Sequence, residues 1–294
     1  MRIEVLGSGG AAIIPRAMCS CSVCEEARQK NVVPFVRYGP SLFIHDINLL
    51  IDTPEEISIQ LNRSRITKVE AALYSHWHPD HTSGMRIWEA NLDPERLWEY
   101  PHKTNCTTIY LPEIVDKTFG EWHDLRERFA YLERLRTVEI QRVPMDKAFA
   151  VGNINITPFA VAEEYVCAFL LEDGKSRVLI CMDELFGWTP PEWLGKLDAA
   201  IMPAGIFELH PRTGDRVIPA HHPILKHEAT FLQTLDIVRK LDVERVIFMH
   251  LNEFDRLRPD DYAEIARRWE NDPRAGLPPF EFAYDTMMID IGRA

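Results

Sequence analysis

Residues 75–81 read Ser-His-Trp-His-Pro-Asp-His, which places three histidines and one carboxylate within six positions. The preceding residues 69–74 are apolar and β-prone, as is typical of a buried strand. Thr82, Ser83 and Gly84 follow with helix-capping and turn chemistry. The run therefore lies on a strand-to-helix loop. Imidazole and carboxylate together suit a divalent transition metal. Ordinary polar loop residues are the alternative, but four potential ligands in six residues favour a metal site.

This run resembles the His-x-His-x-Asp-His hallmark of the metallo-β-lactamase superfamily of hydrolases, and the resemblance covers nearly the whole chain. It implies an α/β fold, a four-layer αββα sandwich with a dinuclear metal site at one edge of two packed sheets. It also implies that His76 and His78 bind one metal ion, and that Asp80 and His81 bind its neighbour.

Two apolar segments further along the chain each end in a potential ligand. Residues 178–182 lead into Asp183, and residues 246–249 lead into His250. The resemblance implies that Asp183 bridges the two metals and that His250 is the last ligand. Polar residues that face solvent at strand ends are the alternative.

The superfamily has one more ligand histidine, shortly after a strand that residues 156–161 resemble. No histidine occurs between His123 and His210, and the vacant position falls on Glu163. A carboxylate is a harder ligand than imidazole, so Glu163 would shift metal preference toward Mn or Fe. Alternatively, Glu163 is a solvated loop residue and the site holds one metal. We interpret Glu163 as a ligand.

A second cluster follows the glycine-rich residues 7–10. Cys19, Cys21 and Cys24 have C-x-C-x-x-C spacing, which fits a structural zinc site that needs one further ligand. Buried or incidental thiols are the alternative interpretation. Within the superfamily, this N-terminal pattern looks like that of the phosphoribosyl cyclic phosphodiesterases of bacterial phosphonate breakdown.

In those enzymes, a histidine three residues beyond the last catalytic ligand completes the zinc site. That position is Glu253 in this chain, so Glu253, His221 and His222 are candidates for the fourth ligand. The resemblance also points to His227, at the expected start of a helix, as the acid that protonates a leaving oxygen. A surface histidine is the alternative there. Asp80 or Asp183 would accept the proton of the nucleophile.

Charge, hydropathy and cysteine content limit the classes of partner and the cell compartment that fit this chain. The 294 residues carry a net charge of −12, which argues against a general nucleic-acid binder, because phosphate-backbone affinity depends on clustered Lys and Arg. A small phosphate ester stays compatible, since bound metals supply positive charge. No segment approaches the roughly 20 apolar residues of a membrane span. Free cysteines with metal-ligand spacing suit a reducing compartment, so we expect a cytoplasmic protein.

We expect one domain over residues 1–294, with pseudo-symmetric halves and a helical elaboration over about 91–142. A charged helix predicted at 121–135 within it is open to two functional uses, a lid over the metals or a contact between copies in a homodimer. Strands are predicted at 2–6, 41–45, 48–52, 69–74, 154–160, 167–171, 178–183, 246–251 and 284–291.

Together these features predict a metal-dependent hydrolase: a phosphodiesterase that uses a metal-bound hydroxide on a small, open or cyclic, phosphate ester. Two divalent ions, Zn or Mn, would serve the active site, and one structural Zn would bind the cysteines. Two alternatives stay open. One is a non-catalytic metal-binding protein related to the quinone-cofactor biosynthesis member of the fold. The other is a hydrolase of a non-phosphate ester or lactone.

Overall fold

The structure, a computed structural model, describes residues 1–99, 105–162, 164–272 and 274–292, and these form two seven-stranded sheets and a small two-stranded one. The first sheet contains, in spatial order, β16 (Met287–Asp290), β1 (Arg2–Gly7), β2 (Ser41–Ile44), β3 (Leu49–Ile51), β4 (Ala71–Leu73), β5 (Thr107–Pro112) and β6 (Val138–Val143). The second contains β15 (Phe280–Phe282), β14 (Val246–Met249), β12 (Ala199–Pro203), β10 (Arg177–Ile180), β9 (Cys167–Glu172), β8 (Ile154–Ala160) and β7 (Phe149–Val151). The small sheet pairs β11 (Lys196–Leu197) with β13 (Asp242–Val243).

The two large sheets share one pairing pattern. Strands from β16 to β3 pair antiparallel in the first sheet, and strands from β3 to β6 pair parallel. In the second sheet, β7 to β10 are antiparallel and β10 to β15 are parallel. This repetition matches the expectation of pseudo-symmetric halves.

Alternate residues of the inner strands face two different apolar cores. On β9, the side chains of Cys167, Phe169 and Leu171 join a core to which strands of both sheets contribute. Ala168 and Leu170, between them, join a second core that helices of the second sheet complete. Because side chains alternate along a strand, such a strand is buried on both faces. The predicted α/β fold, an αββα sandwich, is confirmed.

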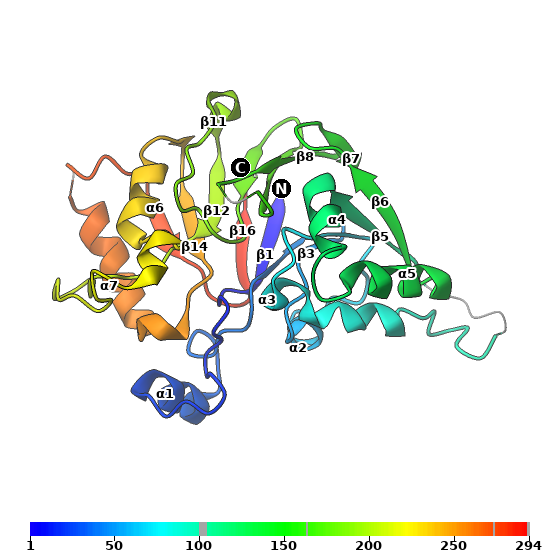
Figure 1. Ribbon diagram of the computed structural model, residues 1–294, viewed down its shortest axis with the longest axis horizontal. Helices are drawn as coiled ribbons and strands as arrows, with labels where there is room; N and C mark the ends of the chain where they lie inside the picture. The colour runs from blue at the N-terminus through cyan, green and yellow to red at the C-terminus, as the bar shows by residue number, and fades with distance from the viewer. Residues whose placement is uncertain (100–104, 163, 273, 293–294) are drawn as a thin grey trace.

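Helices cover the outer faces of both sheets (Figure 1). The α-helices are α1 (Ser22–Lys30), α2 (Ile57–Arg63), α3 (Pro79–Thr82), α4 (Glu113–Phe119), α5 (Leu125–Leu135), α6 (Phe231–Val238) and α7 (Pro259–Glu270). The 3₁₀ helices are η1 (Ser83–Ala90), η2 (Glu192–Leu194), η3 (Pro223–Lys226) and η4 (Glu253–Asp255). The buried apolar residues of α2, α4 and α5 belong to the first core and those of α6 and α7 to the second. Helix α1 projects from the body of the molecule (Figure 1).

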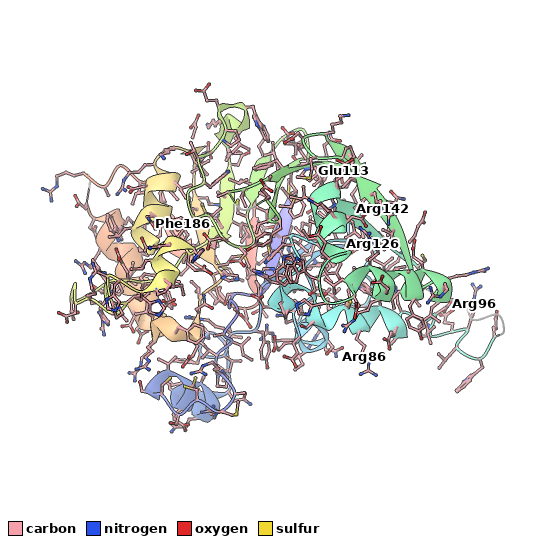
Figure 2. The ribbon with its side chains drawn as sticks, in the orientation of Figure 1. Arg86, Arg96, Glu113, Arg126, Arg142 and Phe186 are labelled. Atoms are coloured by element: carbon pink, nitrogen blue, oxygen red, sulfur yellow. The ribbon has the colours of Figure 1, made fainter. Side chains whose placement is uncertain are left out.

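The segment 91–142 is not only the helical elaboration that we expected. It contributes β5 and β6 to the first sheet as well as α4 and α5. Arg126 on α5 and Arg142 on β6 both contact the carboxylate of Asp116 on α4, at 3.4 and 3.0 Å, which ties the helices to the sheet edge (Figure 2). The predicted helix at 121–135 begins only at Leu125, because His123 and Asp124 have left-handed backbone angles.

All nine predicted strands are present, and six of them are shorter than predicted. The strand predicted at 178–183 ends at Ile180, so Asp183 lies on the loop that follows it. The strand at 284–291 is reduced to Met287–Asp290, which pairs with β1, so the first and last strands of the chain lie side by side (Figure 1). Among the helices of the described residues, every one is too short or too polar to cross a membrane.

Candidate metal centre

The loop after β4 carries the first ligand candidates. His76 is fully buried on this loop, and His78 is half-buried at the N-terminal cap of α3. Pro79 opens α3, which is consistent with the preference of proline for the first helical position. The single turn of α3 then places Asp80 and the fully buried His81 beside the loop. The close spacing in sequence therefore becomes one cluster in space.

Asp183, on the loop after β10, joins two groups of side chains. One consists of His76, His78 and Asp183, and the other of Asp80, His81, Asp183 and His250; within each group the candidate ligand atoms lie within 4.8 Å of one another. Asp183 Oδ2 is 3.3 Å from His76 Nε2, and its Oδ1 is 3.4 Å from His250 Nε2. Atoms bound to one tetrahedral ion at about 2.0–2.2 Å are roughly 3.3–3.6 Å apart. The two oxygens of Asp183 therefore suit a carboxylate shared by two ions.

Four polar atoms of the cluster lack hydrogen-bond partners although they are buried. They are the Nε2 atoms of His76, His81 and His250, and Oδ2 of Asp80. Buried polar atoms in proteins almost always have a partner, and an exception needs an explanation such as an ion. Asp80 Oδ2 lies 3.4 Å from both His81 Nε2 and His250 Nε2. These four atoms can each act as a metal ligand, and they lie close together without hydrogen-bond partners. This arrangement fits a dinuclear metal site.

The electrostatics of the cluster keep both carboxylates charged. Burial alone would raise the pKa of Asp183, but the charge of His250 and the nearby imidazoles of His76 and His78 outweigh burial and hold that pKa well below its ordinary value. The pKa of Asp80 is likewise held well below its ordinary value, against burial, by His81 and His250. Burial, aided by the charge of His81, lowers the pKa of His76 to about 4. Burial thus favours the neutral, metal-binding imidazole at His76, whereas the neighbouring carboxylates raise the pKa values of His81 and His250 against burial, so a metal bound there would displace protons from these two residues.

Asp52, which directly follows β3, contacts two residues of the loop that carries the ligand candidates. Its Oδ2 lies 2.7 Å from His81 Nδ1 and accepts a hydrogen bond from the hydroxyl of Ser75 at 2.6 Å. The Ser75 backbone N–H donates to Oδ1 at 2.7 Å. Sequence reasoning missed this residue; the available signal was a carboxylate at the end of the strand predicted at 48–52.

His250, after β14, has a strained backbone and a close neighbour. Its φ is 58°, an uncommon value for a residue other than glycine. A Cβ on Gly10 would lie 2.7 Å from His250 Nδ1, and the backbone of Leu251 hydrogen-bonds to Ser8 at 2.9 Å. The glycine-rich residues 7–10 therefore pack directly against this ligand candidate.

Two predicted site residues are not part of either group. Glu163 lies outside the described residues, so its role as a ligand stays a prediction. His227 is exposed and follows η3, four residues before α6 begins, rather than at the start of that helix. The helix begins later because Thr230 caps it through a capping box with Gln233. The structure leaves the role of His227 as a prediction.

A pair of glutamates lies next to Asp183, and sequence reasoning missed it too. Burial and a hydrogen bond with Glu228 raise the pKa of Glu184 to about 9. Glu184 also accepts the backbone N–H groups of Phe186 and Ala229. The loop that carries His227 and Glu228 is thereby anchored beside the metal centre.

The cysteine cluster gains its fourth member from η4. Glu253 Oε1 lies 3.0 Å from Sγ of both Cys19 and Cys21, and 3.5 Å from that of Cys24. Burial would raise the pKa of Glu253, but hydrogen bonds from Cys19, Cys21 and Arg16 lower it to about 2. Three thiols and one carboxylate are consistent with a structural metal site. Of the three candidates for the fourth ligand, the structure places Glu253 at the cysteines.

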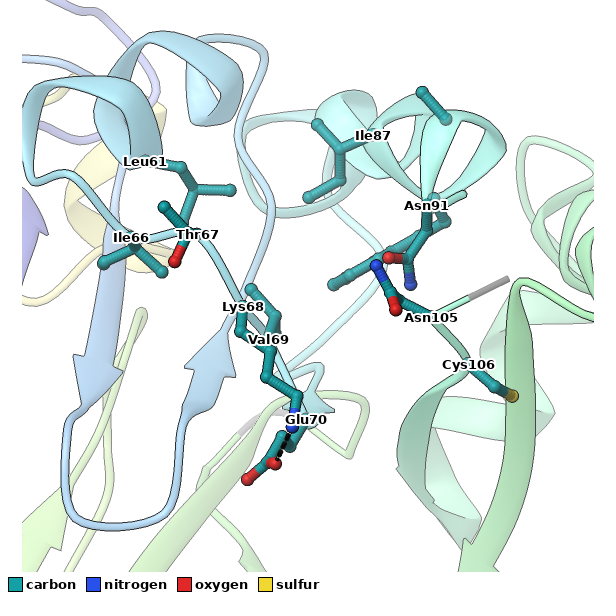
Figure 3. Close-up of a pocket in the computed structure, with 12 residues that line it drawn as sticks. Leu61, Ile66, Thr67, Lys68, Val69, Glu70, Ile87, Asn91, Asn105 and Cys106 are labelled. Atoms are coloured by element: carbon teal, nitrogen blue, oxygen red, sulfur yellow. Dashed lines mark hydrogen bonds and ion pairs between the residues drawn. The ribbon is translucent and has the colours of Figure 1, made fainter. Parts of the chain in front are cut away.

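Figure 3 shows residues that line a cavity, whose volume is about 530 Å³. It is bounded by residues of α2, η1 and the segment before β4, and Lys68 and Glu70 form an ion pair at its edge. No member of either metal cluster lines it.

Comparisons with known proteins agree with this geometry. The sequence profile of the beta-lactamase superfamily domain matches residues 47–251. No curated protein sequence matches the chain.

Three solved structures illustrate the similarity of fold. A diphosphatase of the PhnP family shares 22% identity with a TM-score of 0.70, covering 98% of this chain and 97% of its own. Zn²⁺-bound PqqB from Methylobacterium extorquens shares 16% with a TM-score of 0.72, covering 99% and 100%. The short form of human tRNase Z shares 13% with a TM-score of 0.61, covering 99% of each chain.

Proposed function

Because the chain belongs to the metallo-β-lactamase superfamily, we propose that it is a metal-dependent phosphodiesterase that hydrolyses small phosphate esters, cyclic ones included. One observation carries the proposal: the carboxylate of Asp183 is shared by two groups of buried ligand candidates. His76, His78 and Asp183 would hold one divalent ion, and Asp80, His81 and His250 would hold a second together with Asp183. When bound, such ions polarise a phosphoryl oxygen and activate a water molecule.

The choice of a phosphate ester rests on charge and on a structural neighbour. The carboxylate-rich chain has a net charge of −12, so a small anionic ester would depend on the metal centre for its binding. The similar diphosphatase acts, by its name, on a diphosphate. The same net charge argues against RNA as the substrate, although one similar structure is a tRNase.

The protein's own groups would move the protons. Asp80 has a side chain that is 16% exposed and is the candidate acceptor for the proton of the nucleophile. His227 is the candidate donor to the leaving oxygen. Its loop is held beside Asp183, because the N–H of Ala229 donates to Glu184 at 3.2 Å.

The metals are the first test. A donor set of histidine and aspartate suits Zn or Mn, and the cluster of Cys19, Cys21, Cys24 and Glu253 suits a structural Zn. Plasma mass spectrometry on protein purified without chelator should find two transition-metal equivalents besides the structural one. One or none in the active site, together with no turnover, would favour a non-catalytic metal-binding protein.

The substrate class is the second test. Metal-loaded protein should hydrolyse bis(p-nitrophenyl) phosphate and should lose this activity on chelation. A lactone and a carboxylic ester, assayed in parallel, separate the proposal from the remaining alternative. Turnover of the lactone with no turnover of the phosphodiester would overturn the assignment.

A further inference from the structure

A row of aromatic side chains leads outward from the metal centre. The ring of His78, a metal-ligand candidate, lies 4.5 Å from that of Trp77, centroid to centroid. Trp77 in turn stacks on Trp122, at 4.9 Å and an interplanar angle of 14°. Tyr165 flanks the row, 5.4 Å from His78 and 6.0 Å from Trp77. Two ring contacts thus separate Trp122 from the metal centre.

The loop between α4 and α5 presents Trp122, and it passes beside α3 (Figure 1). The two residues that follow, His123 and Asp124, both have left-handed backbone angles, with φ of 57° and 53°. Successive residues of this kind are energetically costly and are often associated with functional sites. The imidazole of His123 also stacks on Trp77, at 5.6 Å. The strained loop therefore places the rings of both Trp122 and His123 against Trp77, the residue between His76 and His78.

Trp122 remains open to a ligand. Its side chain is 49% exposed, although Trp77 covers one of its faces. Among the described residues, Trp77 is the one aromatic ring that stacks on Trp122, so no other ring covers its second face. A half-exposed indole with one face covered and one face open can stack a further planar ring, an interaction that tolerates any nucleobase.

We propose that this row is a subsite for the planar aromatic ring of the substrate, and that the substrate class is nucleotide phosphodiesters. The inference rests on the proposed function, because the metal centre would bind the phosphate while Trp122 stacks the base. A nucleotide carries both a phosphate and a planar base in one small molecule. An aliphatic ester would gain nothing from the open indole face beyond general apolar contact.

Binding measurements test the subsite without turnover. Isothermal titration calorimetry on metal-loaded protein compares AMP with ribose 5-phosphate, which keeps the sugar and phosphate but lacks the base. Base stacking on an aromatic side chain should make AMP bind roughly 5- to 150-fold more tightly. Trp122→Ala should abolish this preference and leave the affinity for ribose 5-phosphate unchanged, whereas Trp122→Phe should keep part of it.

The chain offers a matched control in Trp193, which is equally exposed at 49% but lies at η2, packed against Phe159. Trp193→Ala should retain the full preference for AMP. Equal affinity of the wild-type protein for both ligands, including no measurable binding of either, would overturn the subsite. So would a loss of preference in Trp193→Ala equal to that in Trp122→Ala.

The subsite and the proposed function fail in different ways. Turnover of bis(p-nitrophenyl) phosphate without a Trp122-dependent preference for AMP rejects the subsite and keeps the phosphodiesterase. A Trp122-dependent preference without turnover of any phosphodiester supports the subsite and rejects the proposed function.

Discussion

Asp52 Oδ2 lies 2.7 Å from Nδ1 of His81, and both side chains are completely buried. The same carboxylate also accepts two hydrogen bonds from Ser75, so its position is determined from several directions. A carboxylate at Nδ1 keeps the imidazole proton on that nitrogen and turns the lone pair of Nε2 toward the metal site. Asp52 therefore selects the tautomer and orientation of a ligand candidate without itself belonging to either metal group.

Replacing Asp52 with asparagine should weaken the metal centre while preserving the fold. Asparagine has nearly the same shape and tolerates the φ of 61° at this position. Its amide can donate to Nδ1 of His81, which would move the imidazole proton to Nε2 and oppose metal binding. We expect metal affinity or turnover to fall by roughly 10- to 100-fold. Competition with a chelator measures the metal affinity, and a hydrolysis assay measures the turnover. Unchanged affinity in a folded Asp52→Asn protein would show that this contact does not position the ligand.

His76→Ala and Asp183→Ala should each abolish hydrolysis but differ in metal content. His76 belongs to one ligand group only, whereas Asp183 belongs to both. We therefore expect His76→Ala to lose one active-site equivalent and Asp183→Ala to weaken both sites. Both residues lie on loops at strand ends, so circular dichroism should show a largely intact fold. Wild-type turnover by either variant after metal reconstitution would remove the assigned site.

The ligand candidates after β4 could be predicted because they are neighbours in sequence. Asp183 and His250 could be predicted because each follows an apolar segment, and the order of such segments matches the superfamily. Asp52 also follows an apolar strand, but a carboxylate that supports another ligand has no spacing that marks it. For the fourth ligand of the cysteine cluster, the sequence left three candidates, of which Glu253 was one. The choice among them required the structure, because only folding brings Glu253 close to Cys19.

Other features depend on contacts between distant parts of the chain. Nothing near Trp122 in the sequence indicates that it stacks on Trp77. Similarly, the glycine-rich residues 7–10 were recognised as a motif, but their packing against His250 is visible only in the fold. Local sequence patterns predict secondary-structure elements and the chemical type of a ligand. They do not predict which loops come into contact in the folded protein.

Gly10→Ala should displace His250 and impair catalysis. An added Cβ would lie 2.7 Å from both His250 Nδ1 and Asn252 Oδ1, closer than real contacts allow, so the imidazole must shift. A misplacement of about 1 Å at a reacting centre can cost roughly 100-fold in rate. Gly174→Ala is the control, because a Cβ there meets nothing within 4 Å although φ is +81°. We expect it to lower stability but not metal content. Full activity in Gly10→Ala would show that His250 tolerates the shift.

Cys21→Ser should lower the melting temperature more than any substitution at the active site. A thiolate metal site contributes its binding free energy to folding, and Cys21 lies in the cluster with Cys19, Cys24 and Glu253. Removal of the metal by a strong chelator should destabilise the wild type in the same way and should have little further effect on the variant. The exposed Cys106 lies outside the cluster, and Cys106→Ser should melt like the wild type. If Cys21→Ser also does so and loses no zinc, the loop is not a metal site.

The resemblance to the superfamily predicts that Glu163 replaces a ligand histidine, and its substitution tests whether the group of His76, His78 and Asp183 has a further member. If Glu163 is a ligand, Glu163→Ala should lose one metal equivalent and most activity, because a two-ion centre becomes a one-ion centre. Glu163→His should instead raise zinc affinity, since imidazole suits zinc well.

The neighbouring Glu164, which is exposed, provides the control for the Glu163 variants. Glu164→Ala should change neither metal stoichiometry nor turnover if Glu163 is the ligand, because a solvated carboxylate contributes little to a buried site. Both quantities are measured on protein purified without chelator. Equal metal content and equal rates in wild type and Glu163→Ala would exclude Glu163. A metal equivalent lost in Glu164→Ala alone would assign the ligand to Glu164, because the two residues are adjacent in the sequence.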